Sequence, residues 1–219
     1  MPPRSADSAP ERIAGAHGVS RESLDRLKAH VELLTKWRAR INLIGPASTE
    51  LIWTRHVADS LQLLPLIGPG PQRLVDLGSG AGFPGLVLAI MLGGQAGNDV
   101  HLIESNGKKA AFLREAARIT GSSAKIHHGR IEDIELEAIG GAADVITARA
   151  LARLSELVAL AAPLADERTR ALFHKGQDVD RELTETTKSW RVSVTKHASR
   201  VDPGGCIVEI RGFEGARRN

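Results

Sequence analysis

The hydrophobic and polar positions of this chain change period along its length, and the pattern predicts an α/β fold. Short apolar runs of strand length lie at 73–77, 99–104, 124–128, 143–147, 170–174, 191–197 and 205–211. Segments with helical spacing lie between them, at 84–93, 106–120, 153–163 and 177–189. Such alternation predicts a doubly wound, mostly parallel seven-stranded sheet with helices on both faces. The turn over 202–205 is too short for a crossover helix, so we expect the last two strands to form an antiparallel edge hairpin.

The chain before the first strand has a helical pattern. Residues 1–18 are rich in Pro, Ser, Ala and Gly without periodicity, and we predict them to be disordered. Ser20 is a suitable cap for a helix over 21–40. A second helix, from 48 or 49 to 66, carries Arg55 and Asp59 four residues apart, a spacing typical of an intrahelical ion pair. We therefore expect 19–219 to be a single domain, with 19–67 as a helical extension packed on the sheet.

The most distinctive stretch is the turn after the first strand, RLVDLGSGAGFPGLVLA over 73–89. Gly78, Gly80 and Gly82 alternate there, and Pro84 stands where it can open the next helix. Glycines allow a strand to turn into a helix so tightly that a ligand can lie against bare backbone. The helix start offers unpaired N–H groups to that ligand. The stretch therefore predicts a nucleotide-type binding turn.

Two glycine registers fit this turn. Gly80-x-Gly82-x-x-Gly85 has the dinucleotide spacing, but it begins two residues further past the strand than that pattern expects. In the other register Asp76 precedes the triplet, and a carboxylate there suits a positively charged ligand such as S-adenosyl-L-methionine better than a pyrophosphate. Glu104, at the end of the second strand, fits the ribose of either an adenosine or an NAD. These residues alone leave both cofactors open.

In the glycine-rich turn and the acid that follows the second strand, the chain resembles the class I S-adenosylmethionine-dependent methyltransferases. Within them it resembles the small-subunit ribosomal RNA guanine-N7 methyltransferases called RsmG or GidB. The motifs are RHVADSL at 55–61, DLGSGAGFPG at 76–85, ESxxKKxxFL at 104–113, RIED at 130–133, ITARA at 146–150 and HKG at 174–176. They occur in order between about Leu24 and about Gly212. One departure is Ile44, where the family commonly has threonine.

The resemblance implies both a cofactor and a substrate. The cofactor implied for this chain is S-adenosyl-L-methionine. The cofactor-binding residues that we expect are Gly78, Phe83, Glu104, Ile131, Glu132 and Arg149. The residues that we expect to face RNA are Arg55, His56 and Lys175. The implied activity is methylation of N7 of a guanine in 16S ribosomal RNA, presented alone or in the small ribosomal subunit. Because N7 carries an in-plane lone pair and no proton, it can attack the methyl group in line without a general base, and we predict no catalytic residue.

Charge and cysteine content narrow the function classes. The net charge of +3 is mild, but from Thr186 to Val201 there are basic residues and no acid, as an RNA-phosphate surface would need. A lone cysteine, Cys206, excludes a disulfide framework and a cysteine zinc site, and its apolar neighbours predict a buried strand position. The longest apolar run is too short to cross a bilayer, and the N-terminus lacks the apolar segment of a signal peptide. We expect a cytoplasmic monomer without metal.

Two other function classes remain open from the residues. A small-molecule methyltransferase of the same fold would be expected to carry an inserted lid, whereas the loops here look short. A non-catalytic nucleotide-binding protein is the second, together with a dehydrogenase that uses the Gly80–Gly85 register. A dehydrogenase needs a proton donor near its nicotinamide, and no residue marks one.

Overall fold

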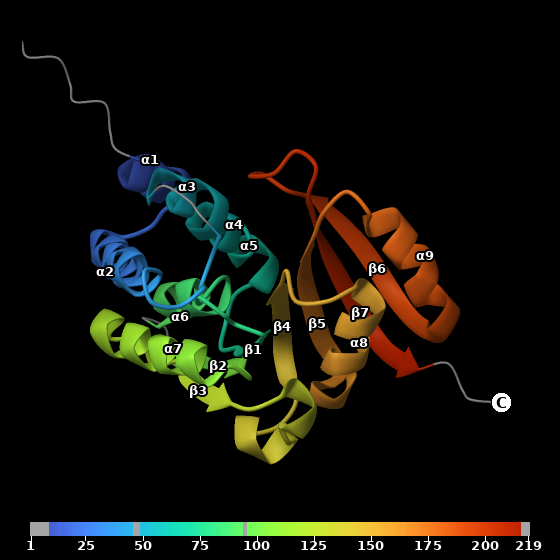
Figure 1. Cartoon of the computed structure of the whole chain (residues 1–219). Helices are drawn as coiled ribbons and strands as arrows, with labels where there is room; N and C mark the ends of the chain where they lie inside the picture. Colours follow the sequence, from blue (N-terminus) through green and yellow to red (C-terminus); the bar gives the residue numbers. More distant parts are fainter. Residues whose placement is uncertain (1–8, 46–48, 94–95, 216–219) are drawn as a thin grey trace, which may run out of the picture.

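A seven-stranded sheet in the order β3-β2-β1-β4-β5-β7-β6 forms the centre of the computed structural model, which describes residues 9–45, 49–93 and 96–215 (Figure 1). The strands are β1 (Arg73–Leu77), β2 (Asp99–Glu104), β3 (Lys125–His128), β4 (Ala143–Arg149), β5 (Ala165–Lys175), β6 (Trp190–Ala198) and β7 (Cys206–Gly215). Strands β1 to β5 are parallel, and β7 is antiparallel to both of its neighbours. The predicted parallel sheet with an antiparallel edge hairpin is confirmed.

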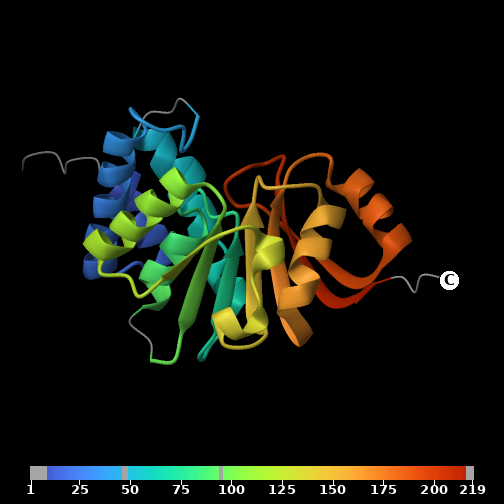
Figure 2. The ribbon, with the colours of Figure 1, turned by 60° about the horizontal axis from the view of Figure 1, so that its bottom comes forward.

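Helices cover both faces of this sheet. The first group is α1 (Ala9–His17), α2 (Arg21–Trp37), α6 (Gly85–Leu92) and α7 (Gly107–Thr120), and the second is α8 (Leu154–Ala161) and α9 (Val179–Ser189). Both views of the ribbon show the two groups apart from each other (Figures 1 and 2). Successive residues of β1 point to opposite faces of the sheet. Leu74 packs in the core under the first group of helices, whereas Val75 packs in the core under the second group.

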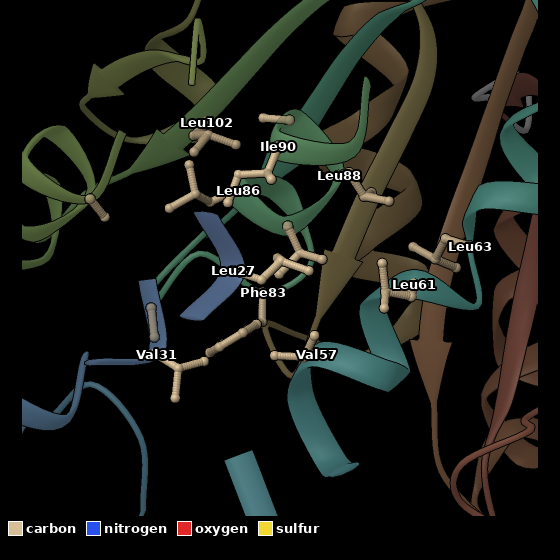
Figure 3. Close-up of a cluster of buried hydrophobic side chains, with 14 of the residues drawn as sticks. Leu27, Val31, Val57, Leu61, Leu63, Phe83, Leu86, Leu88, Ile90 and Leu102 are labelled. Atoms are coloured by element: carbon tan, nitrogen blue, oxygen red, sulfur yellow. The ribbon is translucent and has the colours of Figure 1, made fainter. Parts of the chain in front are cut away.

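The N-terminal extension packs on the glycine-rich turn. Figure 3 shows Phe83 and Leu86 among Leu27 and Val31 of α2, with Val57 on the opposite side. All five side chains belong to one buried core cluster. Ser20 caps α2 as predicted, since its hydroxyl accepts a hydrogen bond from the Ser23 N–H at 3.1 Å. The extension therefore supports the glycine-rich turn on the first face of the sheet, the face that α1, α2, α6 and α7 cover.

Helix α1 corrects the prediction of disorder over 1–18, of which residues 1–8 lie outside the described part of the chain. Ala9 and Ala14 are buried in this helix. Lys28 of α2 donates to the carboxylate of Glu11 at 2.7 Å. The buried positions of α1 are alanines, which give little contrast in a hydrophobic pattern, so its packing was not visible from the sequence.

The helix predicted from 48 or 49 to 66 is divided; residue 48 lies outside the described residues. It consists of α3 (Thr49–Ile52), the π-helical turn η1 (Trp53–Val57), α4 (Ala58–Leu61) and α5 (Leu64–Ile67). A π turn widens the helix, so residues four apart no longer lie one above the other. The predicted Arg55–Asp59 ion pair is therefore wrong. The Asp59 carboxylate pairs with Arg149 of β4 instead, at 3.2 Å.

Strand β5 is longer than predicted, because it begins at Ala165 rather than at 170. The additional part carries Asp166, Glu167 and Arg168, which face solvent wholly or in part and show no apolar alternation. Three short 3-10 helices complete the described fold: η2 (Ile131–Asp133), η3 (Leu136–Ile139) and η4 (Ala162–Leu164). Of these, η2 follows β3 and brings the RIED motif to the end of the sheet where β1 and β2 also finish.

Candidate functional site

The glycine-rich turn has the backbone that its sequence requires. Gly78, Gly80 and Gly82 have φ angles of 65°, 55° and 87°, a region that other residues rarely adopt. At Gly85, the first residue of α6, an added Cβ would lie 2.5 Å from the carboxylate of Asp76. The turn thus needs glycine for backbone conformation at three positions and for close packing at a fourth.

Asp76 lies beneath this turn rather than in a ligand site. Its side chain is buried, and its two carboxylate oxygens accept hydrogen bonds from the Thr147 hydroxyl at 2.6 Å and the Gly85 N–H at 3.2 Å. Burial raises the pKa of this carboxyl to about 6, although the hydrogen bonds from Thr147, Ser79 and Gly85 oppose the shift. The expectation that Asp76 faces a positively charged ligand is therefore wrong; its carboxylate holds the turn in place.

A cavity of about 370 Å³, here called the cofactor cavity, opens at the carboxyl ends of β1, β2 and β3. It brings together four of the predicted cofactor residues: Gly78, Glu104, Ile131 and Glu132. This is the edge of an open parallel sheet at which ligands bind. Its wall also contains residues that the sequence reasoning did not single out, among them Asn106, Gly129 and Leu151.

Glu104 is held firmly at the edge of the cofactor cavity. Its carboxylate accepts hydrogen bonds from the Gly80 N–H at 2.8 Å and the Asn106 N–H at 2.7 Å. Each carboxylate oxygen has a second lone pair, so the same group can also accept two hydroxyl donors from a ribose. Gly80 has open space around it, because an added Cβ would meet only the Gly78 carbonyl, at 3.7 Å. An oriented acceptor beside bare backbone fits the ribose and amino-acid portions of S-adenosylmethionine.

Phe83 and Arg149 are not among the residues that line the cofactor cavity, and their part in cofactor binding stays a prediction. Phe83 is buried, with 5% of its surface exposed, and its ring stacks on His56 with centroids 5.1 Å apart. The Arg149 guanidinium lies over the same ring, 5.5 Å from its centroid. The ion pair with Asp59 draws Arg149 toward the N-terminal extension, and the packing of α2 draws Phe83 into the core.

A second cavity of about 650 Å³, here called the acceptor cavity, lies beside the first. It contains all three residues predicted to face RNA, Arg55, His56 and Lys175, together with Arg149. Its other walls come from the start of α9 and the turn between β6 and β7. Ala150 lines both cavities, so the two adjoin just after β4.

Ion pairs neutralise several charges of the acceptor cavity. Lys175 pairs with Glu182 of α9 at 2.5 Å and donates to the Ala152 carbonyl at 3.1 Å.

The two histidines of the acceptor cavity have lowered pKa values. His174 donates to the Asp59 carbonyl at 3.0 Å, and its burial lowers the pKa of the imidazole. Burial also lowers the pKa of His56 to about 4, helped by the positive charges of Arg149 and Arg55. His56 is therefore neutral near pH 7.

The basic stretch over 186–201 is acid-free in sequence but not in space. Lys188 pairs with Glu185 at 2.8 Å, and Lys196 pairs with Asp180 at 2.6 Å. His197 lies 2.9 Å from Glu209 on the neighbouring strand β7. The partner of Lys188 is three residues away on α9, whereas Asp180 of α9 and Glu209 of β7 are brought to Lys196 and His197 by the fold. The stretch carries less unpaired positive charge than its sequence indicates.

The described residues contain no group of three or more His, Cys, Asp and Glu side chains that could hold a metal ion. His101 instead contacts His127 through ring nitrogens 2.8 Å apart, with the rings stacked.

Cys206 is half-buried in the wall of the acceptor cavity rather than in the core as predicted. Within the described part of the chain, no helix is long and apolar enough to span a membrane.

Comparison with known proteins shows the family to which this chain is similar. The chain matches the family described as rRNA small subunit methyltransferase G over residues 23–204. It is 48% identical to the ribosomal RNA small subunit methyltransferase G of Paramagnetospirillum magneticum, covering 92% of this chain and 95% of that protein. It is 51% identical to the same enzyme of a Bradyrhizobium species, covering 90% and 87% of the two chains.

Solved structures agree at the level of the fold. A TehB-like SAM-dependent methyltransferase from Corynebacterium glutamicum superposes with a TM-score of 0.53 at 15% identity, over 84% of this chain and 98% of that chain. The TYW2 protein of P. horikoshii, solved in complex with MeSAdo, gives a TM-score of 0.53 at 20% identity over 79% and 65% of the two chains. The fold is that of class I methyltransferases, and the chain belongs to the ribosomal RNA small subunit methyltransferase G family.

Proposed function

We propose that this chain transfers the methyl group of S-adenosyl-L-methionine to N7 of a guanine in 16S ribosomal RNA. The observation that carries the proposal is the pair of adjoining cavities at the carboxyl ends of the parallel strands, which share Ala150. One has the lining of a nucleoside site, and the other is larger and lined by Arg55, Arg149 and Lys175. The relatives' shared name, ribosomal RNA small subunit methyltransferase G, supports ribosomal RNA as the substrate.

The cofactor cavity supplies a partner for each part of the cofactor. The Glu104 carboxylate would accept the ribose hydroxyls, and the backbone around Gly78 would face the amino-acid end; both line the cavity. The backbone N–H of Ile131 and the carboxylate of Glu132, which also line it, would face the ring edge and exocyclic amine of the adenine. When bound, S-adenosylmethionine supplies an electrophilic methyl group on a sulfonium. The chain's own contribution is to hold that methyl group at the junction with the acceptor cavity.

The acceptor cavity contributes position rather than proton transfer. His56 is neutral near pH 7, and the Arg149 and Lys175 cations are each held by a carboxylate. Guanine N7 needs no deprotonation before it attacks, so none of these groups has to act as a general base. In-line positioning of the two reactants can supply about 7–11 kcal/mol of barrier lowering. The residues that contact RNA phosphates are the exposed Arg55, at the edge of the cavity, and Lys175.

The proposal extends to the setting of the reaction. We place the protein in the cytoplasm as a monomer, acting on 16S ribosomal RNA alone or within the small subunit. RNA binding through phosphates predicts an affinity that falls steeply with salt.

One experiment tests cofactor and substrate together. Titration calorimetry measures the binding of S-adenosylhomocysteine and of NAD. Methyl transfer is then measured on small subunits from cells that lack this chain, and the modified base is located by mass mapping of the RNA. We expect binding of the adenosylhomocysteine, no binding of NAD, and one N7-methylguanine in 16S RNA. Tight NAD binding without a response to the methyl donor would overturn the methyltransferase proposal. Transfer to small molecules but to no ribosomal substrate would overturn the RNA proposal alone.

A further inference from the structure

Leu151 is a large apolar side chain in an unusual position. It is 38% exposed, and among the described residues only Leu51, at 39%, is a comparably exposed large hydrophobic residue. A single exposed leucine is ordinary, but this one lines the cofactor cavity. It also lies against the glycine-rich turn, since a Cβ added to Gly78 would be 2.7 Å from its Cδ1 atom. Gly78 therefore makes room for Leu151 at the edge of the cofactor cavity.

The loop that carries Leu151 begins at a strained residue and is held by hydrogen bonds at its far end. Ala150 has a φ of 53°, the one positive φ of a non-glycine residue in the described part of the chain. Such a conformation costs about 1–2 kcal/mol and persists only where neighbouring contacts impose it. On the far side, Lys175 donates to the Ala152 carbonyl at 3.1 Å, and the Leu154 N–H donates to Glu182 at 2.6 Å. The fold thus fixes Leu151 immediately after the residue shared by the two cavities.

We propose that Leu151 is an apolar partition that excludes water from the junction between the cofactor and acceptor cavities during methyl transfer. This inference rests on the proposed function. Guanine N7 forms a bond to the methyl carbon while the carbon–sulfur bond breaks, and the electron pair of that bond stays on sulfur. The positive charge, localised on sulfur at the start, is shared between sulfur and the guanine in the transition state. Water stabilises the localised charge better than the shared one, so its exclusion lowers the barrier.

The first test does not depend on activity. Leucine methyl groups are labelled with carbon-13 in the full chain, and their NMR signals are followed during titration with S-adenosylhomocysteine. The Leu151 signals, assigned from their loss in Leu151→Met, should shift on binding, whereas those of Leu51 should stay in place. Leu51 is the matched control, because it is equally exposed and lines neither cavity. Unchanged Leu151 signals at saturation would overturn the inference.

The second test separates water exclusion from simple packing. Single-turnover transfer to small subunits is compared for wild type, Leu151→Ala, Leu151→Ser, Leu151→Met and Leu51→Ala. We expect a rate about tenfold lower for the alanine variant, a lower rate still for serine, and nearly wild-type rates for methionine and Leu51→Ala. The affinity for S-adenosylhomocysteine should change by less than about threefold, a difference below 1 kcal/mol. Equal rates for all variants would overturn the partition, and a loss confined to affinity would make Leu151 a binding contact only. If the wild type itself methylates no ribosomal RNA, the proposed function fails instead.

Discussion

Thr147 of β4 donates its hydroxyl hydrogen bond to the carboxylate of Asp76 in β1, with the two oxygens 2.6 Å apart and both side chains buried. The other oxygen of the same carboxylate accepts the Gly85 N–H at the start of α6. Two neighbouring strands and a helix are thereby joined under the glycine-rich turn. The shape of the cofactor cavity depends on buried groups that do not line it.

Replacing Thr147 by valine should lower the free energy of unfolding by about 1–3 kcal/mol, because a buried carboxylate then lacks one of its donors. Urea unfolding at pH 7 measures the loss. Thr187→Val is the matched control, since Thr187 lies exposed on α9 and donates only to helix carbonyls. Its effect should stay within about 0.5 kcal/mol. Equal losses for the two variants would show that the Asp76 contact contributes nothing of its own.

His30 should make the stability depend on pH. The imidazole is buried and donates to the Ala81 carbonyl at 2.9 Å, and burial lowers its pKa from 6.5 to about 4. Between these values the unfolded chain binds a proton that the folded chain does not. The contribution of His30 is therefore complete above about pH 6.5 and is lost as the pH falls toward 4.

His30→Phe removes this titration. Urea unfolding across that pH window should show a weaker acid-induced loss for the variant than for wild type, although the variant is less stable at pH 7 because Ala81 loses its donor. Asp76 titrates in the opposite sense, since its raised pKa keeps a proton on the folded chain and its contribution falls as the pH rises through about 6. It is present in both proteins, so their difference isolates His30. Parallel pH profiles would contradict the prediction.

Gly78→Ala should lose affinity for S-adenosylhomocysteine by at least about tenfold, as measured by calorimetry. The added methyl group meets Leu151, and the φ of 65° is unfavourable for alanine. Gly121→Ala is the control, because Gly121 ends α7 with a φ of 61° and an added Cβ meets nothing within 4 Å. Both variants should lose about 1–2 kcal/mol of stability, but only the first should lose affinity. Full affinity in Gly78→Ala would make the turn a structural feature alone.

Lys175→Met should weaken RNA binding while leaving the affinity for S-adenosylhomocysteine unchanged. The plot of log affinity against log salt concentration should become shallower by about one unit if the ammonium contacts a phosphate. Lys188→Met is the control, because Lys188 is also paired with a glutamate but lies outside the acceptor cavity. An unchanged slope in Lys175→Met would leave its pair with Glu182 as a structural contact.

The sequence predicted those parts of the site that depend on local backbone. The glycine-rich turn, the acid at the end of β2 and the RIED segment after β3 are each set by a few neighbouring residues, and they meet because parallel strands end at one edge. Arg55, His56 and Lys175, grouped from the sequence as residues expected to face RNA, line one cavity, and their contact with RNA stays a prediction.

Other features required the tertiary structure. The direction in which Arg149 points depends on Asp59, ninety residues earlier in the chain, which the π turn frees from Arg55. The burial of Asp76 depends on Thr147 in the adjacent strand. Likewise, Lys196 and His197 find their partners on α9 and β7. None of these contacts leaves a periodic signal in the sequence.

The position of β7 has a consequence for synthesis on the ribosome. It follows all other described strands in the chain, yet it lies inside the sheet between β5 and β6. Strand β6 therefore has no place to dock until β7 has emerged, whereas β1 to β4 can pair as they are made. Cys206, the first residue of β7, closes a wall of the acceptor cavity. A nascent chain can thus complete the walls of the cofactor cavity before those of the acceptor cavity, which close only when β7 is in place.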